Sequence, residues 1–207
     1  TVDSSFTVDD TDVGFNFGIL WSFAENWRLG GVYRSGPRFD YELFNVAGPL
    51  NEHPEGTILA SVLDRSIAFP DVWGLGVAYR SPGGSVMVGF EWDRVEYTVI
   101  LETLGSSQVD TADVSVGNAD ELRLGCEYVF MNFKPLVAIR GGVWHDPDHR
   151  FRYEGDDPFT RALYPPGGDT THITVGAGIA FSHFQIDLGA DFSDIADAFT
   201  LSAIYGF

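Results

Sequence analysis

The sequence predicts an all-β protein, a transmembrane antiparallel up-and-down β-barrel, from three observations. Large apolar residues alternate with small, polar or charged residues over nine segments of the chain, and this period of two is that of a β-strand. The connections between these segments are alternately short and long, as in outer-membrane barrels. The chain ends on an alternating segment that finishes with an aromatic residue, Phe207.

Composition excludes several other classes of protein. The 207 residues are 44% apolar and 14% aromatic, which is too hydrophobic for a disordered chain. No apolar run reaches the roughly 18 residues that a helical membrane span requires. With 12 basic and 30 acidic residues the net charge is −18, and this charge repels nucleic acid. The single cysteine, Cys126, cannot form an internal disulfide.

The first three segments separate large apolar side chains from glycine and charged ones. The first covers residues 13–23 and puts six large apolar side chains on one face. The second covers 28–34 and the third 73–80, and Arg28 and Arg34 fall on the inward face, opposite the apolar one. An apolar face of this length requires a nonpolar surround, so we expect these strands to face lipid.

The fourth segment changes its phase partway along. Apolar residues hold the even positions over 86–92 and the odd positions over 95–101. One extra residue near Asp93 and Arg94, a β-bulge, would restore a single apolar face. The fifth segment, 121–130, alternates regularly.

The remaining segments complete the pattern at the C-terminal end. They cover residues 137–143, 173–181, 184–192 and 199–207. We expect the apolar face of the last one to be the signal that the barrel assembly machinery recognises. That face carries Leu201, Ala203, Tyr205 and Phe207.

The connections define two ends of the predicted barrel. Short turns at the periplasmic end cover 24–26, 81–85, 131–135 and 182–183, and long outer loops cover 37–70, 102–119 and 145–170. A complete bacterial barrel has an even number of strands with both ends in the periplasm. Because nine is odd, we expect further strands to precede Thr1, unless one of the nine segments is misassigned. Residues 1–207 would then be a single outer-membrane β-barrel domain lacking its first strands.

Several stretches resemble one known family. They are 14–18, 26–35, 69–80, 90–97, 121–128 and the terminal strand. The most distinctive feature is a pair of Leu-Gly-x-x-Tyr-Arg hairpins flanking a long loop that ends in Phe69-Pro70-Asp71. In these stretches the chain resembles the C-terminal part of the FadL-type outer-membrane transporters of long-chain fatty acids and other hydrophobic compounds. The resemblance implies a barrel of about fourteen strands, plugged near its N-terminus, that passes substrate from an outer binding site to a lateral opening. Residues 1–207 would lack the N-terminal plug of that barrel as well as its first strands.

Charged residues on the inward face would line the lumen. They are Arg28, Arg34, Glu91, Asp93, Glu121, Arg123, Glu127, Arg140, Asp187 and Asp191. One interpretation is a polar substrate path in which an arginine anchors a carboxylate headgroup, because the planar guanidinium suits that group. The other interpretation is cross-strand ion pairing that fills the barrel and holds a plug.

The first long loop is unusually apolar. Its apolar residues are Leu43, Phe44, Val46, Leu50, Ile58, Leu59, Val62 and Leu63. They would form an extracellular capture patch for a hydrophobic substrate, or they would pack on one another as a lid.

Motifs for catalysis and metal binding are missing from the sequence. There is no Gly-x-Ser-x-Gly elbow and no serine, histidine and carboxylate on neighbouring inward positions. His145, His149 and His172 flank an aspartate-rich loop, but their spacing fits no compact ligand loop. We therefore expect no enzymatic activity, no cofactor and no metal site.

These features predict a passive transporter in the outer membrane of a Gram-negative bacterium, which carries long-chain fatty acids or other hydrophobic compounds by binding-assisted diffusion. The expected partners are outer-membrane lipid, lipopolysaccharide, a hydrophobic small molecule and the barrel assembly machinery, with no nucleic acid, and the barrel would be a monomer. The alternatives are a structural or adhesive barrel, a general porin, and a soluble β-domain whose apolar face is covered by a second sheet.

Overall fold

The computed structural model describes the backbone of residues 2–7, 9–47, 59–103 and 113–206, and it describes side chains within 9–42, 64–101 and 113–206. Among the described residues, none of the helices is long and apolar enough to span a membrane.

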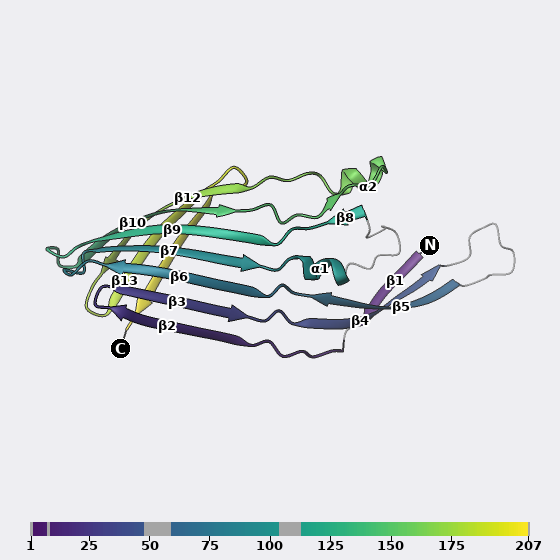
Figure 1. The fold of residues 1–207 in the computed structure, drawn as a ribbon, viewed down its shortest axis with the longest axis horizontal. Helices are drawn as coiled ribbons and strands as arrows, with labels where there is room; N and C mark the ends of the chain where they lie inside the picture. The colour runs from purple at the N-terminus through teal and green to yellow at the C-terminus, as the bar shows by residue number, and fades with distance from the viewer. Residues whose placement is uncertain (1, 8, 48–58, 104–112, 207) are drawn as a thin grey trace.

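Nine antiparallel strands form one curved sheet, which we call the wall (Figure 1). Its spatial order is β14-β13-β12-β10-β9-β7-β6-β3-β2. The strands are β2 (Asn16–Ala24), β3 (Trp27–Arg34), β6 (Val72–Arg80), β7 (Val86–Val95), β9 (Ala119–Phe130), β10 (Leu136–Asp146), β12 (Thr170–Ala180), β13 (Phe184–Phe192) and β14 (Ala198–Tyr205). The nine segments predicted from alternation are therefore confirmed as strands, and they pair as an up-and-down meander. β2 and β14 are the two edges of this sheet.

The sequence predicted that the first long connection is a loop, and this prediction is wrong. The connection is a β-ribbon. β4 (Arg38–Ala47) and β5 (Leu59–Ala68) pair in register over ten residue pairs, and we call them the outer ribbon. β1 (Val2–Thr7) pairs with the free side of β4. In Figure 1 these strands extend beyond the outer end of the wall. Residues 37–70 were predicted to be a loop because the regular alternation of the wall strands stops there, whereas the chain continues in strand conformation on both sides of the connection.

The other two long connections contain short elements. They are α1 (Thr98–Thr103), β8 (Val114–Ser115), β11 (Arg152–Tyr153) and α2 (Pro158–Leu163). β8 pairs with β11 and so joins the two connections. Asp157 caps the N-terminus of α2, since its carboxylate accepts a hydrogen bond from the Thr160 amide at 2.7 Å.

The β-bulge predicted near Asp93 and Arg94 is wrong. β7 pairs continuously with both β6 and β9 through these two residues. The change of phase after Val95 instead marks the end of the strand, because residues 98–103 turn into α1. A register irregularity does occur in β2, between Trp21 and Ala24.

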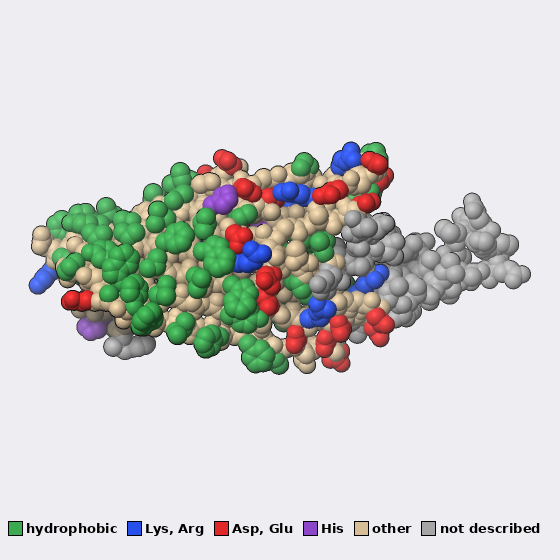
Figure 2. Space-filling view, viewed as in Figure 1, with side chains coloured by type: hydrophobic (Ala, Val, Ile, Leu, Met, Phe, Trp, Pro, Cys, Tyr) green, Lys and Arg blue, Asp and Glu red, His purple; other side chains and the backbone are tan. Residues whose placement is uncertain are grey.

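The outward face of the wall is a continuous apolar surface. Phe17, Ile19, Leu75 and Leu188 each expose more than half of their surface, and Figure 2 shows hydrophobic side chains spread over this face. In the described part of the chain the buried hydrophobic residues are few and small, so no protein layer covers this side. Such a surface is stable only against another nonpolar medium.

Aromatic side chains gather at the end of the wall that carries the short turns. Trp27 and Tyr79 lie 5.0 Å apart between ring centroids, and Tyr128 and Phe130 lie 4.9 Å apart. Further ring contacts join Trp21 to Phe23, Phe23 to Trp27, Phe130 to Phe133 and Phe181 to Phe184. Aromatic residues with this distribution are typical of the membrane interface of a barrel.

Candidate functional site

Gly31, Gly141, Arg94 and Asp120 lie on the outward face of the wall, but most of its charged and glycine residues share the concave face. Strand pairing aligns them in three rows that run across the strands. The outer row is Glu91, Arg123, Trp144 and His172; the middle row is Ala78, Gly89, Gly125 and Gly142; the row nearest the short turns is Met87, Glu127, Arg140 and Gly176. Two polar clusters are thus separated by a strip of glycine.

Arg140 holds together three strands of the wall. Its Nε donates to Glu127 Oε2 on β9 at 2.7 Å, and one terminal nitrogen donates to Asp187 Oδ1 on β13 at 2.6 Å. β12 lies between β10 and β13, and Gly178 is the residue that faces Asp187 there. A Cβ atom at Gly178 would collide with the Asp187 carboxylate and approach the Arg140 guanidinium to 3.1 Å. The missing side chain is therefore what lets Arg140 reach across β12.

Arg123 is surrounded by three carboxylates. It pairs with Glu91 at 3.1 Å, with Asp93 of the same strand, and with Glu121 of its own strand. Its guanidinium carbon lies 5.4 Å from the centre of the Trp144 ring, within the range of a cation–π contact. One arginine cannot neutralise three acids, so this cluster carries net negative charge.

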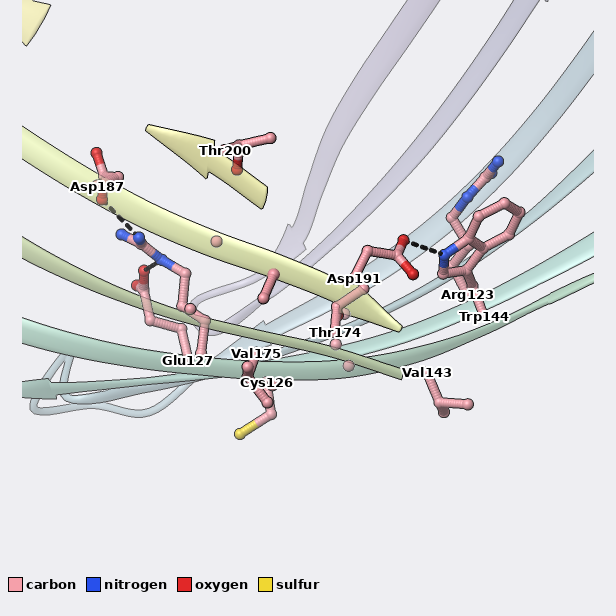
Figure 3. A pocket seen from close by; sticks show the side chains of 18 of the residues that line it. Arg123, Cys126, Glu127, Val143, Trp144, Thr174, Val175, Asp187, Asp191 and Thr200 are labelled. Carbon is pink, nitrogen blue, oxygen red and sulfur yellow. Dashed lines mark hydrogen bonds and ion pairs between the residues drawn. The ribbon is translucent and has the colours of Figure 1, made fainter. Parts of the chain in front are cut away.

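Asp191 organises an aromatic pair beside the Arg123 cluster. Trp144 and His172 stack with their ring centroids 3.8 Å apart and an angle of 20° between the ring planes. The Asp191 carboxylate accepts from Trp144 Nε1 at 3.2 Å and lies 2.8 Å from His172 Nδ1. Figure 3 shows the bond from Trp144 to Asp191.

A cavity of about 740 Å³ lies on the concave face between the two clusters (Figure 3). Arg123, Trp144 and Asp191 bound it on one side, and Glu127, Arg140 and Asp187 bound it on the other. Its floor includes Gly125, where an added Cβ would meet nothing closer than a backbone oxygen 4.0 Å away. The side chains of Cys126 and Val143 point away from the cavity. The volume is that of a site for one small organic molecule.

Arg28 and Arg34 differ from the other two lumen arginines. Each lines a smaller cavity, of about 480 Å³ for Arg28 and about 420 Å³ for Arg34. Neither side chain forms a hydrogen bond or an ion pair with any residue that the structure describes. Within the described residues the guanidinium groups of Arg28 and Arg34 thus have no carboxylate partner, whereas those of Arg123 and Arg140 are paired.

The predicted lumen residues thus fall into separate groups. The structure brings Glu91, Asp93 and Glu121 to Arg123, and it brings Glu127 and Asp187 to Arg140. Asp191 contacts Trp144 and His172, neither of which was predicted to face inward. Sequence reasoning ended the sixth strand at residue 143 and began the seventh at 173. Inward positions continue on β10 from Gly142 to Trp144, and following that alternation further would have found the tryptophan.

The predicted capture patch lies largely outside the described residues. The backbone pairs Leu43 with Leu63 and Phe44 with Val62, and it also includes Val46 and Leu59 in the outer ribbon. The side chains of these six residues, and all of Leu50 and Ile58, are not described. The patch stays a prediction. The same holds for the assembly signal, of which Leu201, Ala203 and Tyr205 lie on β14 while Phe207 is outside the described residues.

The aspartate-rich outer connection is organised by ion pairs. Asp148 is almost completely buried and accepts from Arg150 Nε at 3.0 Å and from a terminal nitrogen of Arg152 at 2.7 Å. Burial opposes ionisation of Asp148, but the hydrogen bonds from Arg152 and Arg150 outweigh it and lower its pKa to about 2. His145 lies 3.7 Å from Asp169, and His149 lies 3.4 Å from Asp146. Within the described ranges, no three His, Cys, Asp or Glu side chains are arranged to hold a metal ion.

Comparison with known proteins gives structural matches only. No family model matches the sequence, and no curated protein matches it. The chain is similar to the CymD monoaromatic hydrocarbon channel, with a TM-score of 0.57 and 15% identity over 99% of this chain and 56% of that one. It is similar to a Pseudomonas aeruginosa FadL homologue, with a TM-score of 0.59 and 17% identity over 95% of this chain and 50% of the other.

The P. putida toluene transporter TodX matches with a TM-score of 0.50 and 13% identity, over 92% of this chain and 46% of that protein. Identities this low show a common fold and nothing finer. The chain spans about half the length of each of these three proteins.

Proposed function

We propose that this chain, which has the FadL-type transporter fold, forms part of the wall of an outer-membrane channel. The channel would carry hydrophobic molecules by binding-assisted diffusion. The observation that carries the proposal is the opposite character of the two faces of one nine-stranded sheet. The outward face is apolar, and the concave face carries ion-paired residues around a cavity of about 740 Å³. An apolar exterior and a polar interior are the requirements of a barrel in lipid.

The substrate class in this proposal is long-chain fatty acids or similar hydrophobic compounds. The fold shared with two proteins described as hydrocarbon channels or transporters supports a hydrophobic substrate. The guanidinium groups of Arg28 and Arg34, which have no ion-pair partner among the described residues, support one with an anionic headgroup, because arginine binds a carboxylate through two parallel hydrogen bonds. Substrate would bind first at the apolar patch of the outer ribbon and then enter the cavity down its gradient.

The two ion-paired clusters have a different role in this proposal. The guanidinium groups of Arg123 and Arg140 are already held by two or three carboxylates each, so they support the wall and bound the cavity without binding a headgroup. This is the specific observation that favours a structural role for part of the lumen. It applies to these two clusters and leaves Arg28 and Arg34 as the binding residues.

The location and partners follow from the same proposal. The short turns face the periplasm, the outer ribbon faces lipopolysaccharide, and the apolar face contacts outer-membrane lipid around a monomeric barrel. The barrel assembly machinery recognises the face of β14 that includes Leu201, Ala203 and Tyr205, together with Phe207. No cofactor takes part, and the protein is not an enzyme.

The test is uptake of radiolabelled oleate by cells that express the full-length gene. Deleting residues 40–65 removes most of the outer ribbon, and we expect uptake to fall to the level of cells without the gene. A deletion confined to residues 158–163, which form α2 on a neighbouring connection, is the control and should leave most uptake intact. Normal uptake without the ribbon would remove it from the mechanism, and no uptake by the unaltered protein would refute the transport proposal itself.

A further inference from the structure

The Phe69-Pro70-Asp71 sequence lies at a break where the outer ribbon leaves the wall. The last pair of the β3–β6 ladder is Arg34 with Val72, and the first pair of the β4–β5 ladder is Arg38 with Ala68. Three residues on each strand separate these pairs, so the register is the same on both sides. Pro37 and Pro70 lie in the break, and since proline has no amide hydrogen neither of them can donate to the ladder.

Neighbouring strands change partners at the same level. β3 pairs with β2, whereas β4 pairs with β1, and residues 9–15 between β1 and β2 are not in a strand. Carboxylates there replace backbone acceptors. Asp12 accepts from the Arg38 amide at 2.6 Å, and Asp10 accepts from the Asp40 amide at 2.7 Å. The break thus crosses three neighbouring segments of the chain, which are residues 9–15, 35–37 and 69–71. Side-chain hydrogen bonds connect these segments where the backbone ladder is interrupted.

Asp71 makes the central contacts of this break. Its Oδ1 accepts from the Gly36 amide at 2.8 Å, and its Oδ2 accepts from the Tyr33 hydroxyl at 2.7 Å. Gly36 is required there, because a Cβ atom would overlap the carbonyl group of Phe69. The carboxylate therefore ties the end of the wall strand β3 to the start of the ribbon.

Other contacts make the wall side of this tie rigid. The Tyr33 ring lies 4.3 Å from the Trp73 ring between centroids, and the backbone oxygen of Asp71 accepts from the Glu96 amide at 3.0 Å. On the ribbon side, the Phe69 amide donates to the Pro37 oxygen at 2.9 Å, and the Phe69 ring packs edge-on against Phe39. The Asp71 side chain joins these two rigid parts.

We infer that Asp71 is a positioning residue: it fixes the angle at which the outer ribbon leaves the wall. This inference does not rest on the proposed function. Two hydrogen bonds to one carboxylate set a single orientation more strictly than a flexible loop can, because each bond constrains a different part of the break.

The test measures the ribbon angle directly in the full-length protein in lipid bilayers. Spin labels are placed at Asp64 on β5 and at Asp194 in the connection between β13 and β14, both exposed, in a Cys126→Ser background because the native thiol is exposed. We expect Asp71→Ala to broaden and shift the distance distribution between the labels, and Tyr33→Phe, which removes one of the two bonds, to broaden it less. Amide exchange at Gly36 should accelerate by roughly tenfold in Asp71→Ala.

Asp9→Ala is the matched control. This carboxylate lies in the same break, is exposed, and has no hydrogen bond or ion pair to the part of the chain that the structure describes. It should reproduce the parent distribution. An unchanged distribution in Asp71→Ala, or equal broadening in Asp9→Ala, would overturn the inference.

Oleate uptake by the same variants tests whether the angle of the ribbon affects the proposed transport. Lower uptake in Asp71→Ala, with recovery in Asp71→Asn, whose amide oxygen still accepts a hydrogen bond, would support a role of the angle in capture. A broadened distribution with unchanged uptake would overturn that role. Failure of transport as a function would appear instead as no uptake by the parent protein.

Discussion

At the scale of single residues, the absence of a side chain at Gly178 decides whether Arg140 and Asp187 can meet. The bridge passes over β12, and a Cβ atom at this position would occupy the space that the Asp187 carboxylate fills. Gly125 is on the same face, but an added Cβ there would meet no side chain. The lack of a side chain therefore has a different consequence at the two glycines: Gly178 leaves room for an ion pair, and Gly125 does not. The alternating sequence pattern around them is the same.

We expect Gly178→Ala to lower the free energy of unfolding by about 1–3 kcal/mol, the usual cost of leaving a partly buried charged group without its partner. Gly125→Ala should change it by less than about 0.5 kcal/mol. The measurement is urea unfolding of the protein in lipid vesicles, followed by tryptophan fluorescence. Equal destabilisation by both substitutions would show that the bridge over β12 is not the cause.

Arg34 provides the residue-scale test of the substrate headgroup. We expect Arg34→Gln to reduce oleate uptake roughly tenfold, since a hydrogen bond to a charged group contributes about 1.5–3 kcal/mol. Toluene uptake should be unchanged, because toluene has no charge to bind. Arg80→Gln is the control, since this arginine contacts Met87 and carries no ion pair among the described residues. Equal loss for oleate and toluene would rule out a headgroup contact.

At the scale of elements, the outer connection that carries Asp148 should respond to acid. Its pKa in the folded protein, about 2, is below the ordinary value of 3.8, so the unfolded form binds the proton more readily. The ion pairs therefore stabilise the connection above about pH 4 and lose that effect as the pH falls from about 4 to about 2. Side-chain NMR signals of Arg150 and Arg152 should titrate with a midpoint near pH 2. A midpoint near 3.8 would contradict the buried pairing.

The elements also show what the sequence could and could not predict. Alternation located the nine wall strands because lipid on one side and the lumen on the other impose a strict period of two. The same criterion failed beyond the wall, where the outer ribbon was predicted to be a loop and α1 to be more strand, since neither belongs to the nine-stranded sheet. Trp144 and His172 were missed because the polar ends of β10 and β12 were assigned to the connection. Pairings such as Arg140 with Asp187 depend on strands that are not adjacent in the sheet, and no local pattern contains that information.

At the scale of the whole molecule, the two faces of the wall predict how the intact protein conducts ions. The side chains of the Arg123 and Arg140 clusters occupy part of the concave face, so we expect brief, low-conductance openings of the full-length protein in planar bilayers. Gly125→Trp should reduce oleate uptake severalfold by filling the cavity floor, without changing the unfolding free energy as Gly178→Ala does. Wide and steady conductance would instead identify a general porin and overturn the proposed channel.

The unbroken register across the Pro37 and Pro70 break means that the outer ribbon is a module. Residues added or removed in facing pairs beyond Arg38 and Ala68 would leave every residue pair of the wall unchanged. Evolution, or an engineer grafting ribbons from related proteins, could therefore exchange the ribbon for one of another length or sequence. The nine strands of the wall would need no compensating change.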